Sequence, residues 1–224
     1  MESPDALRVV VAGASGLVGQ GVLRACRQAT PAGRLVSLVR RRGATGLPGV
    51  EEIVLPDFSQ AGHHIDDLRG FDACLYCAGA PPIGTPERAY RHVTVELTLV
   101  VAQAFAAANP HGRFLYVSGA QANPRSPVMP LRIKGEIEQA LAALPIRTVV
   151  LRPGGVRPVA GTGTAHALLK PFYAVSRPLM AVAETLFPAL VVSNEAIGRA
   201  MLALARSANA PARVECADIH HWAR

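Results

Sequence analysis

One segment near the N-terminus has glycines at a spacing that suits the binding of a phosphate group. Directly after an apolar run at 9–12 stand Gly13-Ala14-Ser15-Gly16-Leu17-Val18-Gly19, and a helical pattern follows. The first glycine permits a tight strand-to-helix turn, the second lets the backbone approach a pyrophosphate, and the third lets helix and strand pack closely. The anion then lies at the free N–H groups and positive dipole end of the helix. The segment therefore predicts a dinucleotide site, the alternative being a glycine-rich turn without a ligand.

Three consecutive arginines stand where a second strand is expected to end. Residues 34–42 read RLVSLVRRR, an apolar strand pattern that closes on Arg40, Arg41 and Arg42. At this point of a dinucleotide fold an acidic residue selects NAD through the ribose 2′-hydroxyl, whereas an arginine accommodates the 2′-phosphate of NADP. Because the acid is missing, the sequence favours NADP, with NAD as the alternative cofactor. Arg40 is the first candidate for this contact and Arg41 the second; a solvated basic loop without a ligand is the other interpretation.

Strands and helices alternate along the chain, and their order predicts the sheet that would position these residues. Further strands are expected at 53–55, 71–79, 113–118 and 147–151, and helices at 62–69, after a cap at Thr85, and at 130–144. Such alternation implies a parallel sheet with helices on both faces and right-handed crossovers. The chain has 224 residues, of which 50% are hydrophobic, so it can bury a full core. We expect one α/β domain over 1–224, a doubly wound parallel sheet of the Rossmann type, with a small C-terminal helical lid at 157–190 on the substrate side.

Taken together, these motifs resemble the short-chain dehydrogenase/reductase superfamily, and specifically its atypical members. The Lys134-Gly135-Glu136 motif and the motif at 151–156 look most like the branch of small NAD(P)-binding proteins related to the human Tat-interacting protein and to NAD-dependent epimerases and dehydratases. The resemblance covers nearly the whole chain. Besides the glycine-rich loop it rests on Asp57-Phe58, Cys77-Ala78-Gly79, Val117-Ser118, Lys134-Gly135-Glu136 and Leu151-Arg152-Pro153-Gly154-Gly155-Val156.

The resemblance implies how a bound dinucleotide would be held. Asp57 would bind the adenine amino group, with Phe58 alongside. The Cys77 motif would bring Ala78 and Gly79 under the adenosine ribose and the pyrophosphate. The nicotinamide would be lined by Pro153, Gly154, Gly155 and Val156.

The catalytic residues depart from the superfamily pattern. There, a tyrosine four residues before a lysine exchanges a proton with the substrate oxygen, the lysine lowers the tyrosine pKa, and a serine positions the substrate. Ser118 and Lys134 match the serine and the lysine, and Lys134 would also reach the nicotinamide ribose. Pro130 stands in the place of the tyrosine and has no proton to give. Other proton sources are water, His92 or a tyrosine from elsewhere in the chain, namely Tyr116, Tyr90 or Tyr173.

Two functions therefore stay open. The first is an NADP(H)-dependent reductase of a small or apolar carbonyl compound, because residues 157–187 are rich in Pro, Ala and Leu and carry little charge. The second is a non-catalytic NADP(H)-binding module with a regulatory role or a protein partner. The chain would act as a monomer or a homodimer.

Composition argues against several other classes of protein. The net charge is +7, but the arginines are dispersed and no aromatic platform accompanies 40–42, so we expect no nucleic-acid partner. No run of about twenty apolar residues is present and residues 1–6 lack a signal-peptide pattern, so we expect a cytoplasmic protein without stable membrane insertion. Segment 167–190 could lie on a membrane surface, but its prolines favour core or dimer packing. Cys74 and Cys77 lie in one predicted strand and point to opposite faces, so no metal site is expected.

Overall fold

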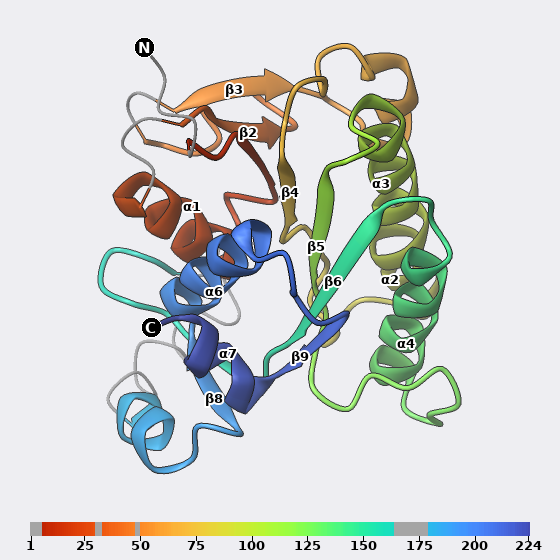
Figure 1. Ribbon diagram of the computed structural model, residues 1–224. Helices are drawn as coiled ribbons and strands as arrows, with labels where there is room; N and C mark the ends of the chain where they lie inside the picture. Colours follow the sequence, from red (N-terminus) through yellow and green to blue (C-terminus); the bar gives the residue numbers. More distant parts are fainter. Residues whose placement is uncertain (1–5, 30–32, 48–49, 164–178) are drawn as a thin grey trace.

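The computed structural model describes residues 6–29, 33–47, 50–163 and 179–224, which form a parallel sheet with helices on both faces (Figure 1). The strand order is β3-β2-β1-β4-β5-β6-β9, and every neighbouring pair is parallel. The sheet grows outward from β1 and β4, which is the doubly wound arrangement that the sequence predicted. Its strands are β1 (Val9–Ala12), β2 (Leu35–Val39), β3 (Glu51–Val54), β4 (Ala73–Tyr76), β5 (Arg113–Val117), β6 (Arg147–Arg152) and β9 (Arg213–Glu215).

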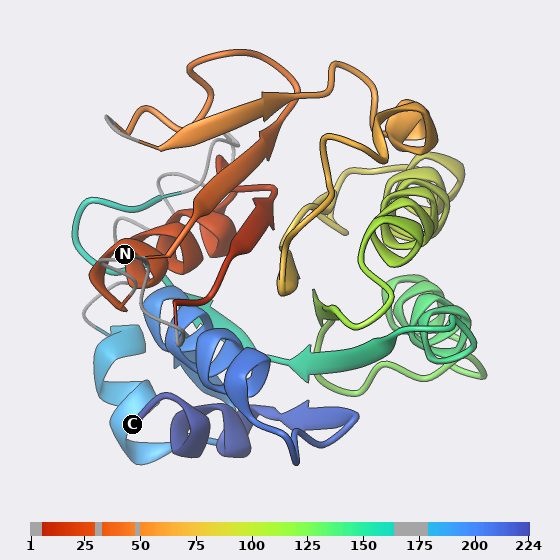
Figure 2. The same ribbon diagram turned by 45° about the horizontal axis from the view of Figure 1, so that its top comes forward.

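Two separate cores form because side chains alternate between the faces of each strand. In β1, Val9 and Val11 belong to one core and Val10 and Ala12 to the other, and all four are fully buried. Figures 1 and 2 show α1 and α6 on one side of the sheet and α3 and α4 on the other. The first face carries α1 (Leu17–Ala29), α6 (Asn194–Arg206) and α7 (Cys216–Trp222), and the second carries a 3-10 helix, η1 (Phe58–His64), with α3 (Leu97–Ala108) and α4 (Met129–Ala142).

The segment between β4 and β5 differs from the predicted helix with a Thr85 cap. Pro86 precedes helix α2 (Glu87–Arg91), which continues through a π-helical turn, η2 (His92–Glu96), into α3. This turn leaves His92 exposed and buries Thr94. Thr85 does not cap the helix because the residue at the cap position is Pro86, which has no side-chain oxygen to accept the free N–H groups.

The region between β2 and β4 contains less α-helix than a doubly wound sheet usually has. The predicted helix at 62–69 is instead η1, which starts earlier because the Asp57 carboxylate caps it, accepting from the Ser59 N–H at 2.9 Å. Between β2 and β3 the described residues contain no helix, although parallel neighbours are usually joined through one. The flank of α1 that faces this connection is therefore not covered by a crossover helix.

The C-terminal third adds elements that the sequence interpretation did not include. Strand β7 (Gly155–Arg157) pairs in parallel with β8 (Val191–Ser193) in a second, two-stranded sheet. After α6 the chain adds β9 and α7. Of the predicted lid at 157–190, residues 164–178 lie outside the described part, and residues 179–186 are helical. Among the described helices, none is long and apolar enough to cross a membrane.

Candidate functional site

The glycine-rich loop lies where the sheet changes its direction of winding. After β1 the chain moves to β2 on one side, and it later returns to place β4 on the other side of β1. In open parallel sheets, ligands bind in the crevice at the carboxyl ends of the strands at such a switch point. The Cys77 N–H donates to the Ala12 carbonyl at 2.8 Å, so the ends of β1 and β4 lie side by side. The structure thus brings together the predicted loop 13–19 and the predicted segment 77–79.

Two of the three glycines are required by the packing of the loop itself. Gly13 has a φ of +81°, and a Cβ there would lie 2.4 Å from the Ala78 nitrogen. A Cβ at Gly19 would lie 2.0 Å from the Gly13 carbonyl oxygen, so α1 can pack on the loop only with glycine at this position. These contacts correspond to the tight turn and the close helix packing expected of the first and third glycines.

The second glycine faces open space. A Cβ at Gly16 would meet only the Gly13 carbonyl oxygen, at 3.3 Å, and a Cβ at Gly79 would meet no atom within 4 Å. Gly16 precedes the first residue of α1, and its carbonyl accepts from the Gln20 N–H at 3.0 Å. The N–H groups of the first turn, beginning at Leu17 and Val18, have no acceptor within the helix. The loop thus offers donors and room for an anion at one point.

The predicted 2′-phosphate residues lie at the end of the strand next to β1. Arg40 directly follows β2, and the side chains of Arg40 and Arg41 are both exposed. Within the described residues neither side chain forms a hydrogen bond or an ion pair. Both guanidinium groups are therefore available to an anionic ligand.

The predicted adenine residues have different surroundings. The exposed Asp57 carboxylate accepts from the Ser59 N–H, and this hydrogen bond holds the pKa of Asp57 below its usual value. Phe58 is 7% exposed and packs in the core beneath α3. Contact of either residue with an adenine ring stays a prediction.

The predicted catalytic serine and lysine are held together by a buried carboxylate. Lys134 donates through Nζ to the Ser118 carbonyl at 2.5 Å, while the Ser118 hydroxyl donates to Glu138 Oε1 at 2.5 Å. Glu138 also accepts from Arg152 Nε at 3.0 Å and Nη2 at 2.5 Å. Ser118 is only 2% exposed. In this arrangement the Ser118 hydroxyl is directed at Glu138 and away from the crevice.

Glu138 was not among the residues expected from the sequence, although its spacing from Lys134 could have indicated its place. It follows Lys134 by four residues, so both lie on the same face of α4, next to the end of β5. Arg152 is the last residue of β6 and begins the motif in which only Pro153 to Val156 were given a role, that of lining the nicotinamide. Burial lowers the pKa of Lys134 from 10.5 to about 8, against the opposite effect of Glu138. A buried carboxylate and a buried arginine persist because each compensates the charge of the other.

None of the described tyrosines takes the place of the missing one. Tyr116 is 2% exposed and stacks near Tyr76, with ring centroids 6.1 Å apart, in the core under α3 and α4. Burial raises the pKa of Tyr116 well above its usual value. Tyr90 is 1% exposed, and the third candidate, Tyr173, lies outside the described residues. Pro130 lies in the first turn of α4, as its conformational preference predicts.

The remaining site residues follow β6. The Ala120 N–H donates to the Pro153 carbonyl at 2.8 Å, which ties the loop after β5 to the loop after β6. A Cβ at Gly154 would lie 2.2 Å from the Leu190 carbonyl oxygen, so the chain directly before β8 crosses over this glycine. The Gly155 N–H donates to the same carbonyl at 2.7 Å, and Val156 continues into β7. This segment is thus bound to the C-terminal part of the fold, at the edge of the crevice.

Comparison with known proteins identifies the fold. No family model matches the chain. A curated relative, leucinostatins biosynthesis cluster protein T of Purpureocillium lilacinum, is 28% identical over 141 residues, which are 62% of this chain and 52% of that protein. The chain therefore spans about half the length of this relative.

Two solved structures share the architecture at low sequence identity. ADP-L-glycero-D-manno-heptose-6-epimerase of Helicobacter pylori aligns with a TM-score of 0.67 and 13% identity, over 96% of this chain and 79% of the epimerase. A short-chain dehydrogenase/reductase superfamily protein of Agrobacterium tumefaciens, with bound NAD, aligns with a TM-score of 0.63 and 18% identity, over 92% of this chain and 76% of that protein. The expected resemblance is confirmed at the level of the fold: the chain has the Rossmann architecture of this superfamily.

The lowered pKa of Lys134 predicts how the stability of the protein changes with pH. Between about pH 8 and 10.5 the unfolded chain keeps the lysine proton while the folded protein releases it, so stability rises with pH in this window. Below it the lysine is charged in both states and its contribution is constant. We expect the free energy of unfolding of the wild type, relative to Lys134→Met, to increase from about pH 7.5 to about pH 9.5.

Urea unfolding of both proteins at both pH values measures this difference. The buried cysteines, whose pKa values are raised, act in the opposite direction but equally in both proteins. Unfolding free energies that change in parallel with pH would show that Lys134 titrates normally.

Proposed function

We propose that this protein binds NADP(H) in the crevice between the ends of β1 and β4 and uses it to reduce a small or apolar carbonyl compound. The observation that carries the proposal is the glycine-rich loop: Gly13 and Gly19 are required by close backbone contacts, whereas a Cβ at Gly16, at the start of α1, would meet only the Gly13 carbonyl oxygen, at 3.3 Å. Packing therefore restricts this second position less than the other two, and the fold gives a weaker reason for glycine there. A bound pyrophosphate explains this glycine, because its oxygens would occupy the space and accept from the first-turn N–H groups.

The choice of NADP(H) rests on the end of β2. Arg40 and Arg41 offer two uncompensated guanidinium groups beside the loop, and no carboxylate stands in the place of the acid that binds a ribose 2′-hydroxyl. The Agrobacterium protein holds NAD, so NAD is the alternative cofactor. The name of the curated relative refers to a biosynthetic cluster, which supports a small-molecule substrate for this chain as well.

Catalysis requires a dry site and a source of protons. When bound, the reduced dinucleotide supplies a hydride, and a proton must reach the substrate oxygen from the protein or from water. Lys134 lies at the end of β5 with a pKa of about 8, so it holds its proton at neutral pH and is acidic enough to give it up. The Lys134 ammonium group could therefore supply the proton that the missing tyrosine would give.

A second candidate function is binding of NADP(H) without chemistry. It is favoured by the positions of the catalytic residues: Ser118 is buried and bonded to Glu138, and Pro130 replaces the tyrosine. A protein of this kind would report the redox state of the cofactor pool to a partner. Turnover of the bound cofactor distinguishes the two functions.

The first prediction tests the cofactor site through Gly16→Asp. Aspartate is a preferred residue directly before a helix, where its carboxylate accepts from the first-turn N–H groups that a pyrophosphate would use. We expect a folded protein that has lost binding of NADPH and NADH, measured by fluorescence titration. Gly62→Asp is the matched control, since a Cβ there meets no atom within 4 Å and the residue belongs to η1 and not to the loop. Retained affinity in Gly16→Asp would remove the basis of the proposed function.

The second prediction concerns Arg40. Arg40→Ala should weaken NADPH binding by about 1.5–3 kcal/mol, the range for a hydrogen bond to a charged group, and leave NADH nearly unchanged. Calorimetric titration with both cofactors measures the difference, with Arg41→Ala as the comparison. Equal losses for the two cofactors would assign Arg40 a structural role, and an effect confined to Arg41→Ala would move the 2′-phosphate contact by one residue.

The third prediction separates the reductase from the binding module. Pro130 is half-buried in the first turn of α4, one helical turn before Lys134, so Pro130→Tyr would place a hydroxyl next to the ammonium group. If the site is otherwise competent, reduction of a reactive aldehyde should rise about a hundredfold, the usual effect of a positioned general acid. Oxidation of NADPH, followed by absorbance, measures the rate.

Pro130→Phe is the matched control for this prediction, because it adds the ring without the hydroxyl. A higher rate only in Pro130→Tyr supports the reductase. If the wild type already turns over and Pro130→Tyr is slower, another proton donor is in use. No turnover in any of the three proteins, with NADPH binding intact, supports the binding module.

A further inference from the structure

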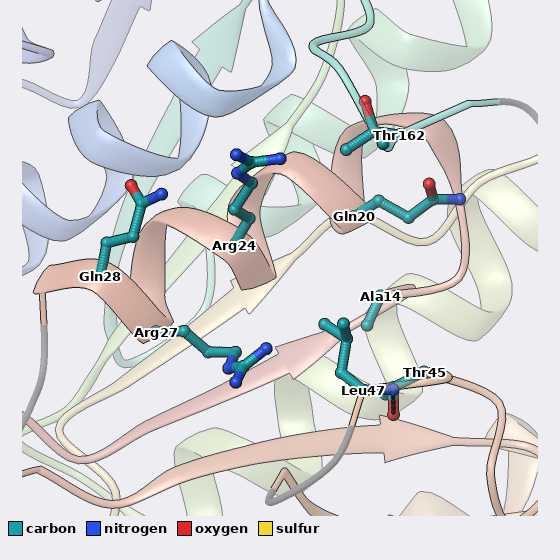
Figure 3. A pocket seen from close by; sticks show the side chains of 9 residues that line it. Ala14, Gln20, Arg24, Arg27, Gln28, Thr45, Leu47 and Thr162 are labelled. Atoms are coloured by element: carbon teal, nitrogen blue, oxygen red, sulfur yellow. Dashed lines mark hydrogen bonds between the residues drawn. The ribbon is translucent and has the colours of Figure 1, made fainter.

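A cavity of about 450 Å³ lies along the flank of α1, outside the crevice described above (Figure 3). Its wall on the helix consists of Gln20, Arg24, Arg27 and Gln28, which share one helix face because of their spacing. Figure 3 shows Arg27 extending toward the segment after β2, with Thr45 and Leu47, whereas Arg24 and Gln28 extend to the other side of the helix and Gln20 lies near Thr162. The cavity exists because no crossover helix between β2 and β3 covers this flank.

The wall formed after β2 is fixed by one carboxylate. Glu52 accepts from the Gly43 N–H at 2.6 Å, from the Thr45 N–H at 3.2 Å and from the Thr45 hydroxyl at 3.0 Å. These hydrogen bonds hold the pKa of Glu52 below its usual value. Glu52 therefore fixes the position of this loop, and no contact with α1 across the cavity is needed to hold it.

The opposite wall, residues 159–163, is fastened to α1. Gln20 donates to the Gly163 carbonyl and accepts from the Gly163 N–H, both at 2.9 Å. Arg24 Nη1 donates to the Ala160 carbonyl at 2.7 Å, and the Val159 N–H donates to Asn194 Oδ1 at 3.2 Å. With both walls held in this way, the cavity is formed before any ligand arrives, as is usual for small-molecule sites.

The charge inside the cavity is positive and incompletely balanced. Arg27 is exposed and has no hydrogen bond or ion pair with the described residues. Arg24 lies 3.5 Å from Glu195, but that carboxylate is also paired with Arg199 at 2.9 Å. The other carboxylate near the wall, Glu52, is occupied by the loop. One arginine is thus free and a second is only partly neutralised, one turn apart on the same helix face.

We infer that this cavity is a second ligand site, which binds a small phosphorylated compound. A phosphate group carries close to two negative charges and three acceptor oxygens, which suits Arg27, the arginine of this wall whose side chain has no partner among the described residues. Thr45 adds a hydroxyl, and Leu47 and Ala14 offer apolar surface to the rest of the ligand. The site uses the flank of α1 and adjoins the glycine-rich loop at Ala14, whereas the dinucleotide would use the N-terminus of this helix. The inference does not rest on the proposed function.

Calorimetric titration with inorganic pyrophosphate tests the site. The titration uses the Gly16→Asp variant, so that the glycine-rich loop does not contribute, and the same variant with either Arg27→Gln or Arg125→Gln added. Both further substitutions remove one positive charge from an exposed arginine whose side chain has no partner among the described residues, so the protein should stay folded. Circular dichroism and urea unfolding verify this.

Each outcome decides for or against the site. We expect saturable binding to Gly16→Asp, a loss of about tenfold or more on adding Arg27→Gln, and a change within about twofold on adding Arg125→Gln. Absence of binding to Gly16→Asp, with binding to the wild type, would mean that pyrophosphate occupies the glycine-rich loop alone and would overturn the inference. Equal losses of affinity from the two arginine substitutions would show that pyrophosphate is attracted by general surface charge, which would overturn the inference. Binding of NADPH to the wild type, measured separately, bears only on the proposed function.

Discussion

The approach of two backbone loops at the centre of the sheet constrains everything around it. The turn after β1 meets the segment after β4 so closely that residue 13 has no room for a side chain, and its φ of +81° is one that glycine adopts without strain. This contact lets the Cys77 N–H pair with the Ala12 carbonyl and sets the start of α1 at the sheet edge. The first-turn N–H groups of that helix consequently point into the same crevice that the ends of β1 and β4 enclose.

A buried ionic group has a comparable effect at the other side of the crevice. Glu138 and Arg152 are nearly inaccessible to water, so each must satisfy the other, and the arrangement also binds the Ser118 hydroxyl. Arg152 Nη2 further donates to the Ala122 carbonyl at 2.9 Å, which joins α4, the loop after β5 and the end of β6. A serine in such a network is a structural element. In this respect the arrangement differs from the catalytic serine expected of a tyrosine-dependent reductase.

The missing crossover helix between β2 and β3 links the two ligand sites considered above. Without it, the three arginines after β2 stay exposed at the sheet edge, and the flank of α1 is open to an anion. Both consequences concentrate positive charge around one helix. In a chain with a net charge of +7, the described structure therefore places uncompensated arginines next to cavities, where a phosphate can reach them.

Much of the fold could be predicted from the sequence, because it depends on local patterns. Apolar runs of four or five residues, each followed by a turn and an amphipathic helix, determine a parallel sheet, and the glycine spacing identifies the turn after β1 as a phosphate loop. The lysine and the proline of α4 could likewise be placed, since Pro130 opens a helix and Lys134 lies one turn later. The short strands β7, β8 and β9 carry no such pattern and were not expected.

The surroundings of each site residue depended on tertiary structure, because they are set by residues far away in the chain. The sequence pattern predicts that Ser118 contacts the substrate, but in the structure its hydroxyl donates to Glu138, 20 residues later. Tyr116 was a candidate proton donor in the sequence, but in the structure it packs near Tyr76 and α3 and is buried. Spacing alone does not distinguish Gly16, the least crowded glycine of the loop, from Gly13 and Gly19, which are packed against backbone. Sequence thus determined which residues meet at the crevice, and long-range packing decided which of their groups are directed into it.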